Sequence, residues 1–198
     1  MLTETRGKEI YEKAKLVNAI SDEYQLIHAT FALEKIFNEE LKEKYGQSIA
    51  ELREQIANES DNDKLAELSK KACELTKAGR KQKVKISLIY ENEIDENSAR
   101  TTKTKNTYMI LLPEKLRKIR NEGGTINLER LKKLRHLMAH ELGHILLHSN
   151  SIVNGEPQGT DLLGDIEEEE ADLFANYLIE LRKKRNDELY KNCNYTQI

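Results

Sequence analysis

Apolar residues recur every three or four positions along the first part of the chain, which predicts helices separated by short turns. The predicted helices of this part cover residues 4–45, 48–57 and 63–78. Ser21 and Asp22 favour helix N-caps and could divide the first stretch into two helices. Gly46 and Gly79 stand at the ends of two predicted helices and are expected to stop them.

The period of the pattern changes to two after residue 80, which predicts β-strands. Apolar and polar side chains alternate over residues 84–90, and a second strand is predicted over 107–112, stopped by Pro113. The link over residues 94–106 is polar and long for a hairpin, so we expect an exposed, mobile loop there.

Helical periodicity returns after these strands. The predicted elements are a short helix over 113–122, a helix over 128–148 capped by Asn127, a loop over 149–164, and a last helix from Asp165 to about Tyr190. This order predicts an α+β, predominantly helical fold with a small sheet. We expect a helical N-terminal region over 1–80 and a core over 81–198, either as two domains or as one integrated domain.

Composition and charge exclude several classes of protein. The chain has 198 residues, enough for one domain or one domain with a small appendage. Its 32 basic and 35 acidic residues give a net charge of −3, which does not favour nucleic acid or membrane binding. Cys73 and Cys193 are too few for a disulfide framework, and no apolar run suits a secretory signal or a membrane span. We therefore expect a cytoplasmic protein with reduced thiols.

The sequence His140-Glu141-Leu142-Gly143-His144 lies inside the predicted 128–148 helix. Residues four apart share one helix face, so both imidazoles can reach one Zn²⁺ ion at about 2.0–2.1 Å. Glu141 lies about 100° round the helix from His140, where it can act as the general base on a water molecule. Gly143 costs about 1 kcal/mol in a helix, which close packing of another element would explain.

Catalytic zinc takes three protein ligands, so a third is expected from the start of the last helix. Glu168 is the preferred candidate, and Asp172, four residues later on the same face, could fix the tautomer of a ligand imidazole. The other candidates in this acidic run are Glu167, Glu169 and Glu170. Asp165 and Glu168 also fit a capping box, which would make Glu168 purely structural.

The remaining charged and imidazole side chains favour structural roles. His136 and His148 extend the series of histidines spaced by four residues, but one ion cannot take all of them, because the outer pair lie about 18 Å apart. We expect His148 to pack or bond near the helix end, and His136 to lie at the surface or beside a ligand. The basic runs 130–135 and 182–185 are typical of solvated helix faces, and His28 of a helix side chain without a metal.

The two motifs together resemble the ImmA/IrrE family of zinc metallopeptidases. The similarity rests on His-Glu-Leu-Gly-His followed by Ile-Leu-Leu-His, and on Glu168, Ala171, Asp172, Phe174 and Ala175 in the next helix. The motif order is also similar to that of gluzincins, in which a Glu is the third ligand. The resemblance implies a zincin-like core whose preceding strands line a substrate cleft. It further implies the cleavage or release of a repressor, as in mobile genetic elements or stress responses.

Our first hypothesis is a cytoplasmic zinc endopeptidase that acts on a regulatory protein, with no direct contact to nucleic acid or membrane. His140, His144 and Glu168 would hold Zn²⁺, Glu141 would be the catalytic base, and Asp172 would orient a ligand. The alternative is a partner-binding regulator whose zinc site is not catalytic and whose first 80 residues form the interaction surface. A third hypothesis is a helical nucleic-acid binder that uses the basic runs.

Overall fold

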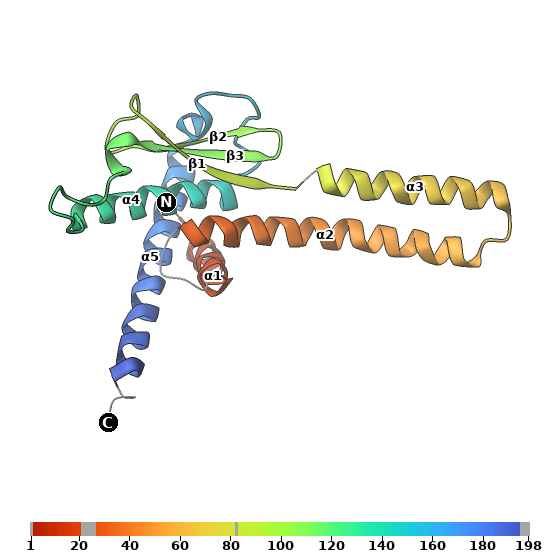
Figure 1. Cartoon of the computed structure of the whole chain (residues 1–198), viewed down its shortest axis with the longest axis horizontal. Coiled ribbons are helices and arrows are strands. Elements are labelled where there is room, and N and C mark those ends of the chain that lie inside the picture. The colour runs from red at the N-terminus through yellow and green to blue at the C-terminus, as the bar shows by residue number, and fades with distance from the viewer. Residues whose placement is uncertain (1, 21–26, 82, 195–198) are drawn as a thin grey trace. The chain divides into compact units, whose positions relative to one another are not determined.

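The computed structural model describes residues 2–20, 27–81 and 83–194 (Figure 1). Its helices are α1 (Glu4–Ile20), α2 (Ile27–Asn58), α3 (Asn62–Lys81), α4 (Leu128–Leu147) and α5 (Asp165–Asn194). Its strands are β1 (Lys85–Glu91), β2 (Arg100–Thr104) and β3 (Thr107–Pro113), and two short 3-10 helices are η1 (Glu114–Leu116) and η2 (Gly159–Leu162). This content confirms the predicted α+β, mostly helical class. The predicted break at Ser21 and Asp22 lies outside the described residues.

The chain folds into two compact units. The core unit comprises Met1–Leu33 and Ile86–Ile198, and the hairpin unit comprises Glu34–Lys85. The expected division into domains at residue 80 stays a prediction. Among the described residues, none of the helices combines the length and the apolarity needed to cross a bilayer.

The sheet of the core unit has the strand order β1-β3-β2 and lies over α4 (Figure 1). β2 pairs with β3 in antiparallel register, and Thr104 faces Thr107 across a tight turn in which Lys105 has a φ of 55°. The prediction of a mobile loop over 94–106 was therefore wrong for its second half. Thr101 and Thr102 are polar but β-branched, so they suit a strand, and both are buried.

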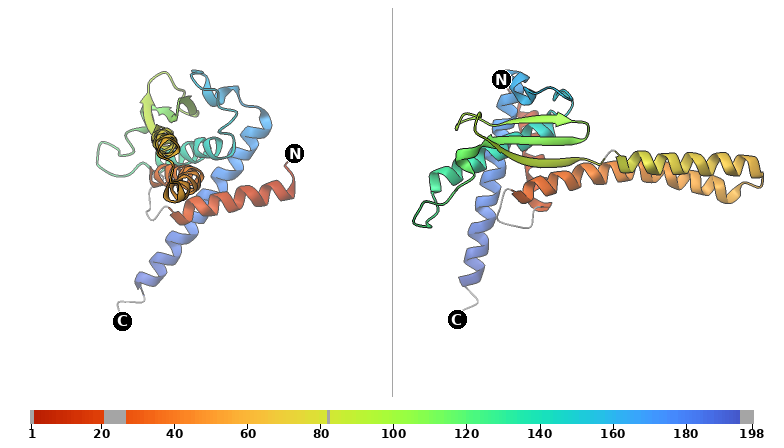
Figure 2. Two further views of the ribbon diagram at one scale, coloured as in Figure 1. Left: turned by 90° about the vertical axis from the view of Figure 1, so that its right-hand side faces the viewer. Right: turned by 45° about the horizontal axis from the view of Figure 1, so that its top comes forward.

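Helix α5 packs against both α4 and α1 (Figure 2). The predicted cap of α4 is confirmed, because the side-chain oxygen of Asn127 accepts a hydrogen bond from the Arg130 amide at 3.1 Å. At Gly143, an added Cβ would lie 3.1 Å from the Ala171 Cα and 3.1 Å from a ring carbon of Phe174. The motif glycine therefore lets α5 approach the helix that carries both motif histidines.

Two predicted helix ends and one predicted helix were wrong. Helix α2 continues through Gly46, and α3 continues through Gly79 for two more residues. A glycine costs only about 1 kcal/mol inside a helix, which a long helix tolerates. At Gly79, an added Cβ would lie 3.3 Å from the Tyr45 ring, so this glycine permits a close helix contact. Within 113–122, only the single turn η1 forms.

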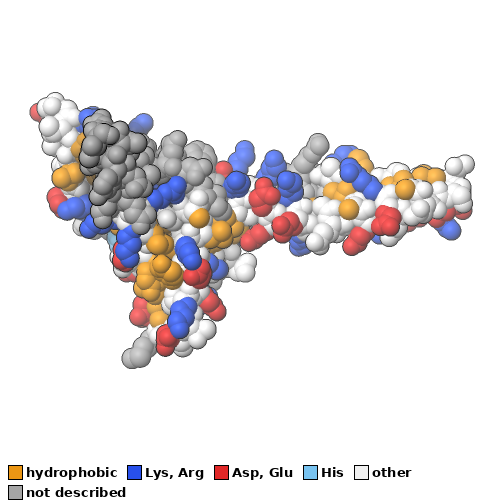
Figure 3. Space-filling model, turned by 90° about the horizontal axis from the view of Figure 1, so that it is seen from below, with side chains coloured by type: hydrophobic (Ala, Val, Ile, Leu, Met, Phe, Trp, Pro, Cys, Tyr) orange, Lys and Arg blue, Asp and Glu red, His pale blue; other side chains and the backbone are white. Residues whose placement is uncertain are grey.

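The hairpin unit consists of the larger part of α2 and the antiparallel helix α3 beside it (Figures 1 and 2). The side chain of Asp61 accepts a hydrogen bond from the Asp63 amide at 2.9 Å and so caps α3. The Asn38 amide group exchanges two hydrogen bonds with the backbone of Val84, at 2.9 and 3.1 Å. Positive and negative side chains are interspersed along the face of this unit that Figure 3 shows.

Candidate functional site

Three potential metal ligands converge where α4 meets the start of α5. His140 and His144 come from consecutive turns of α4, and Glu168 comes from the first turn of α5. Their nearest donor atoms all lie within 4.8 Å of one another. The Nε2 atoms of the two imidazoles are 2.9 Å apart, and the Glu168 oxygens lie 3.1 Å from His140 Nε2 and 3.2 Å from His144 Nε2.

The donor set fits a zinc ion. Two imidazole nitrogens and one carboxylate oxygen are ordinary zinc ligands, and bonds of about 2.0–2.1 Å in a tetrahedral site place such donors about 3.3 Å apart. Burial, together with the neighbouring His140 and His148, lowers the pKa of His144 to about 3. His144 is therefore neutral at neutral pH, which is the form that binds a metal. Burial also raises the pKa of Glu168.

Asp172 lies beside His140, on the side away from the other donors. The Nδ1–H of His140 donates to an Asp172 oxygen at 2.7 Å, which leaves the lone pair of Nε2 facing His144 and Glu168. This hydrogen bond agrees with the prediction that Asp172 fixes the tautomer of a ligand imidazole. The role itself stays a prediction. His136 is partly exposed, with its Nε2 3.8 Å from the same Asp172 oxygen.

The acidic run at the start of α5 divides into separate tasks. Glu167 folds back and accepts a hydrogen bond from the Gly164 amide at 2.9 Å, so this residue caps the helix. Glu168 faces the imidazoles, and Glu169 is exposed. Glu170 lies 2.9 Å from His148 and 2.6 Å from Arg6. Glu167, and not Glu168, therefore caps the start of α5.

Glu141 is buried, with 1% of its surface exposed. Its Oε2 atom accepts hydrogen bonds from the hydroxyls of Thr101 at 2.8 Å and Thr160 at 3.2 Å. Burial raises the pKa of Glu141 to about 7, although both hydroxyls and the nearby His140 oppose the shift. A carboxyl group with such a pKa can exchange a proton near neutral pH.

The two threonines that hold Glu141 were not predicted. Thr101 lies on β2 and Thr160 on η2, and the Thr101 amide donates to the Thr160 hydroxyl at 2.9 Å. At Gly159, φ is +53° and an added Cβ would lie only 2.0 Å from the Thr101 carbonyl oxygen, so only glycine fits. The β-branched run in β2 was an available signal for a strand, but nothing in the sequence links that strand to Glu141.

His148 and Glu170 form a second buried network behind His144. His148 Nδ1 lies 3.3 Å from His144 Nδ1, and its Nε2 lies 2.9 Å from Glu170. Hydrogen bonds from Arg6 lower the pKa of Glu170 to about 2. The predicted bonding of His148 near the helix end is thus observed. The part played by Arg6, 164 residues away in sequence from Glu170, could not be predicted from local spacing.

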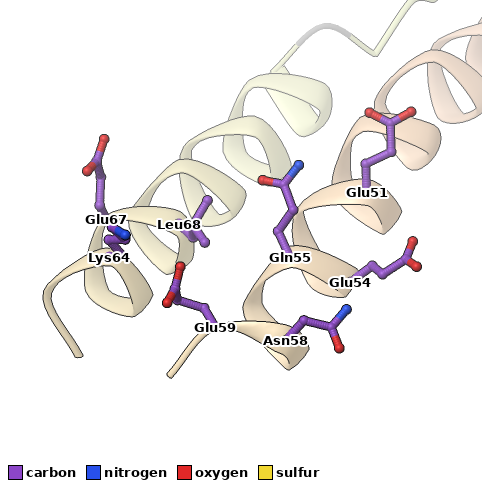
Figure 4. A pocket seen from close by; sticks show the side chains of 8 residues that line it. All are labelled: Glu51, Glu54, Gln55, Asn58, Glu59, Lys64, Glu67 and Leu68. Atoms are coloured by element: carbon purple, nitrogen blue, oxygen red, sulfur yellow. The ribbon is translucent and has the colours of Figure 1, made fainter. Parts of the chain in front are cut away.

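A hollow in the hairpin unit has a different chemistry (Figure 4). It lies near the turn between α2 and α3 and is lined mainly by acidic and amide side chains: Glu51, Glu54, Gln55, Asn58, Glu59, Lys64, Glu67 and Leu68. No imidazole or thiol lines it, and it holds none of the predicted site residues. The candidate chemistry therefore belongs to the core unit.

Comparison with known proteins gives one family match. Residues 127–182 match the family model Peptidase M78, described as an IrrE N-terminal-like domain. This segment includes the whole of α4 and the first part of α5, and so contains His140, Glu141, His144, Glu168 and Asp172. The match confirms the resemblance to ImmA/IrrE metallopeptidases over this part of the chain. Neither the curated proteins nor the solved structures gave a match.

Proposed function

We propose that the core unit is a zincin-like, zinc-dependent endopeptidase that hydrolyses a peptide bond in a regulatory protein, such as a repressor. The peptidase family match supports the reaction class and a protein substrate. The observation that carries the proposal is the convergence of His140, His144 and Glu168 next to a buried Glu141. The repressor is proposed because of the resemblance to ImmA/IrrE peptidases.

The proposed mechanism assigns a task to each side chain. Zinc, when bound by the three donors, supplies a Lewis acid that polarises a carbonyl group and acidifies water. Glu141 takes the proton of the attacking water on its carboxylate and later gives a proton to the amide nitrogen that leaves. The hydroxyls of Thr101 and Thr160 fix the rotation of that carboxylate by holding Oε2. Asp172 holds His140 in the tautomer whose Nε2 is free of hydrogen.

The decisive experiment compares the wild type with Glu141→Gln. The zinc content of each protein is measured, and each is incubated with a candidate repressor protein. We expect equal zinc in both proteins and cleavage by the wild type, with at least a hundredfold lower rate in the variant because it lacks the general base. Mass spectrometry of the products identifies the cleaved bond.

Two acidic residues from the same run provide the matched test of the third ligand. Glu168→Gln should bind zinc at least tenfold more weakly, whereas Glu169→Gln should keep both zinc and cleavage, because Glu169 is exposed outside the donor cluster. A folded wild type that binds no zinc would contradict the proposal. Full regulatory activity in Glu141→Gln would favour the partner-binding regulator with a non-catalytic site.

A further inference from the structure

We propose that His148, Glu170 and Arg6 form a positioning relay that fixes the tautomer of His144 and ties the N-terminal helix α1 to the metal site. This inference rests on the proposed function, because it assigns His144 Nε2 to a metal ion. None of the three relay residues lies among the metal donors themselves. They act through His144.

The relay starts one helical turn beyond His144. His148 Nδ1 lies 3.3 Å from His144 Nδ1, and His148 Nε2 lies 2.9 Å from a Glu170 oxygen. The side chains of His148 and Glu170 are only 6% and 9% exposed. Water therefore cannot readily replace these partners, and each polar atom depends on the one beside it.

Arg6 closes the outer end of the relay from α1. Its Nε and its terminal nitrogen donate to the two oxygens of Glu170 at 2.8 and 2.6 Å, which is the two-pronged geometry of a strong arginine–carboxylate pair. Helix α1 is anchored on α5, where the Tyr11 and Tyr177 rings meet edge to face with centroids 5.2 Å apart. Among the α1 side chains that the structure describes, the buried apolar ones are Ile10, Ala14 and Val17.

The direction of each hydrogen bond along the relay follows from which nitrogen of His144 would bind the metal. If His144 binds through Nε2, its only hydrogen is on Nδ1, so His148 Nδ1 must accept that hydrogen. His148 then carries its own hydrogen on Nε2 and donates it to Glu170, which Arg6 keeps ionised. The opposite direction would place a hydrogen on His144 Nε2 and remove the lone pair that faces His140 and Glu168.

The two imidazole donors are thus held differently. His140 donates straight to Asp172, a carboxylate that is 57% exposed, whereas His144 reaches its carboxylate through a buried second imidazole. Partners of this kind typically change metal affinity by about 10–100-fold. His148, the relay residue in contact with His144, should therefore affect the affinity for the metal more than Arg6 does.

The first test titrates metal-free protein with Co²⁺ and with Zn²⁺ under competition. We expect His148→Phe to weaken binding about 10–100-fold and to change the visible Co²⁺ spectrum. His148→Gln, whose amide has both an acceptor and a donor, should recover most of the affinity. Lys132→Met is the control on the same helix and should stay within about threefold of the wild type, since the Lys132 side chain is exposed and pairs with Glu129, away from the metal donors.

The outer end is tested with Arg6→Met, which keeps the aliphatic stem of the side chain. We expect a smaller loss of affinity, about threefold to tenfold, because Glu170 keeps His148 as a partner. Glu9→Gln is its control, because Glu9 also binds Arg6, at 3.1 Å, but lies outside the relay. Thermal unfolding of each metal-free protein shows whether a variant is folded.

Nitrogen NMR of the zinc-loaded wild type tests the tautomers without any variant. We expect hydrogen on Nδ1 of His144 and on Nε2 of His148. Hydrogen on His148 Nδ1, or wild-type affinity and spectrum in folded His148→Phe and Arg6→Met, would overturn the relay while leaving the proposed function intact. If the folded wild type bound no metal, the proposed function would fail and the relay with it.

Discussion

The core unit and the hairpin unit are both rich in helix, but they bury different kinds of side chain. Among the described residues of the hairpin unit, the buried apolar side chains are Ile36 and Leu52. The core unit buries most of the apolar residues and also charged or titratable groups, including Glu141, His144 and Glu170. Buried polar groups need fixed partners, whereas charges on an exposed hairpin need none. The site is therefore found where packing can hold polar atoms in place.

The largest expected effect comes from Phe174, a fully buried side chain of α5 that lies against Gly143. Phe174→Ala should lower the free energy of unfolding of the core unit by about 3–5 kcal/mol, because it removes apolar contacts and leaves a cavity. Hydrogen exchange measured by mass spectrometry, peptide by peptide, should show faster exchange in α4 and α5. Equal protection in the variant and the wild type would contradict this view of the core.

Metal removal should have the next largest effect and should again distinguish the two units. A ligand at about 100 times its dissociation constant stabilises the folded state by about 2.7 kcal/mol. A chelator should therefore lower the protection of α4 and the start of α5, where the donors lie, and leave α3 unchanged. The same chelator applied to Glu168→Gln is the control, and it should change little.

Gly143 tests the contact between α4 and α5 more finely. An alanine Cβ there would lie 3.1 Å from the Ala171 Cα and 3.2 Å from the Ala171 carbonyl oxygen, and backbone atoms cannot move aside easily. Overpacking costs about 1–3 kcal/mol, and the gain in helix propensity offsets about 1 kcal/mol of it. We expect Gly143→Ala to destabilise the core unit by up to about 2 kcal/mol in urea unfolding. A more stable variant would show that α5 does not press on the motif helix.

The sequence was sufficient to predict the elements whose signal is local. The periodicity of 128–148 and the side chain of Asn127 predicted α4 within one residue. The spacing of His140 and His144 predicted their common face, because four residues make about one helical turn. The helix ends predicted at Gly46 and Gly79 were wrong. The sequence alone does not distinguish a glycine that ends a helix from one that a helix contains at a cost of about 1 kcal/mol.

The contacts that span long stretches of sequence could not be predicted in this way. Thr101 reaches Glu141 only because β2 pairs with β3, and the β-branched residues of this polar segment favour a strand without showing what that strand contacts. Arg6 reaches Glu170 only because α1 packs on α5. The four consecutive glutamates of the run look alike in sequence. Glu167 binds the nearby Gly164 amide, whereas Glu168 is marked as the candidate ligand only by its contact with His140 on α4.

The smallest changes in the free energy of unfolding are expected at Gly46 and Gly79, the two glycines of the hairpin unit. Alanine at these positions should have an effect that differs in sign or size from the effect of alanine at Gly143. Nothing lies within 4 Å of an added Cβ at Gly46, so Gly46→Ala should stabilise this unit by about 1 kcal/mol through helix propensity. At Gly79 the added Cβ would meet the Tyr45 ring at 3.3 Å, and a side chain can shift more easily than backbone. Gly79→Ala should therefore change stability by less than about 0.5 kcal/mol, since the gain and the strain nearly cancel. Hydrogen exchange of α2 and α3 measures both variants, and a loss at Gly46 as large as that at Gly143 would mean that the hairpin unit is packed as tightly as the core unit.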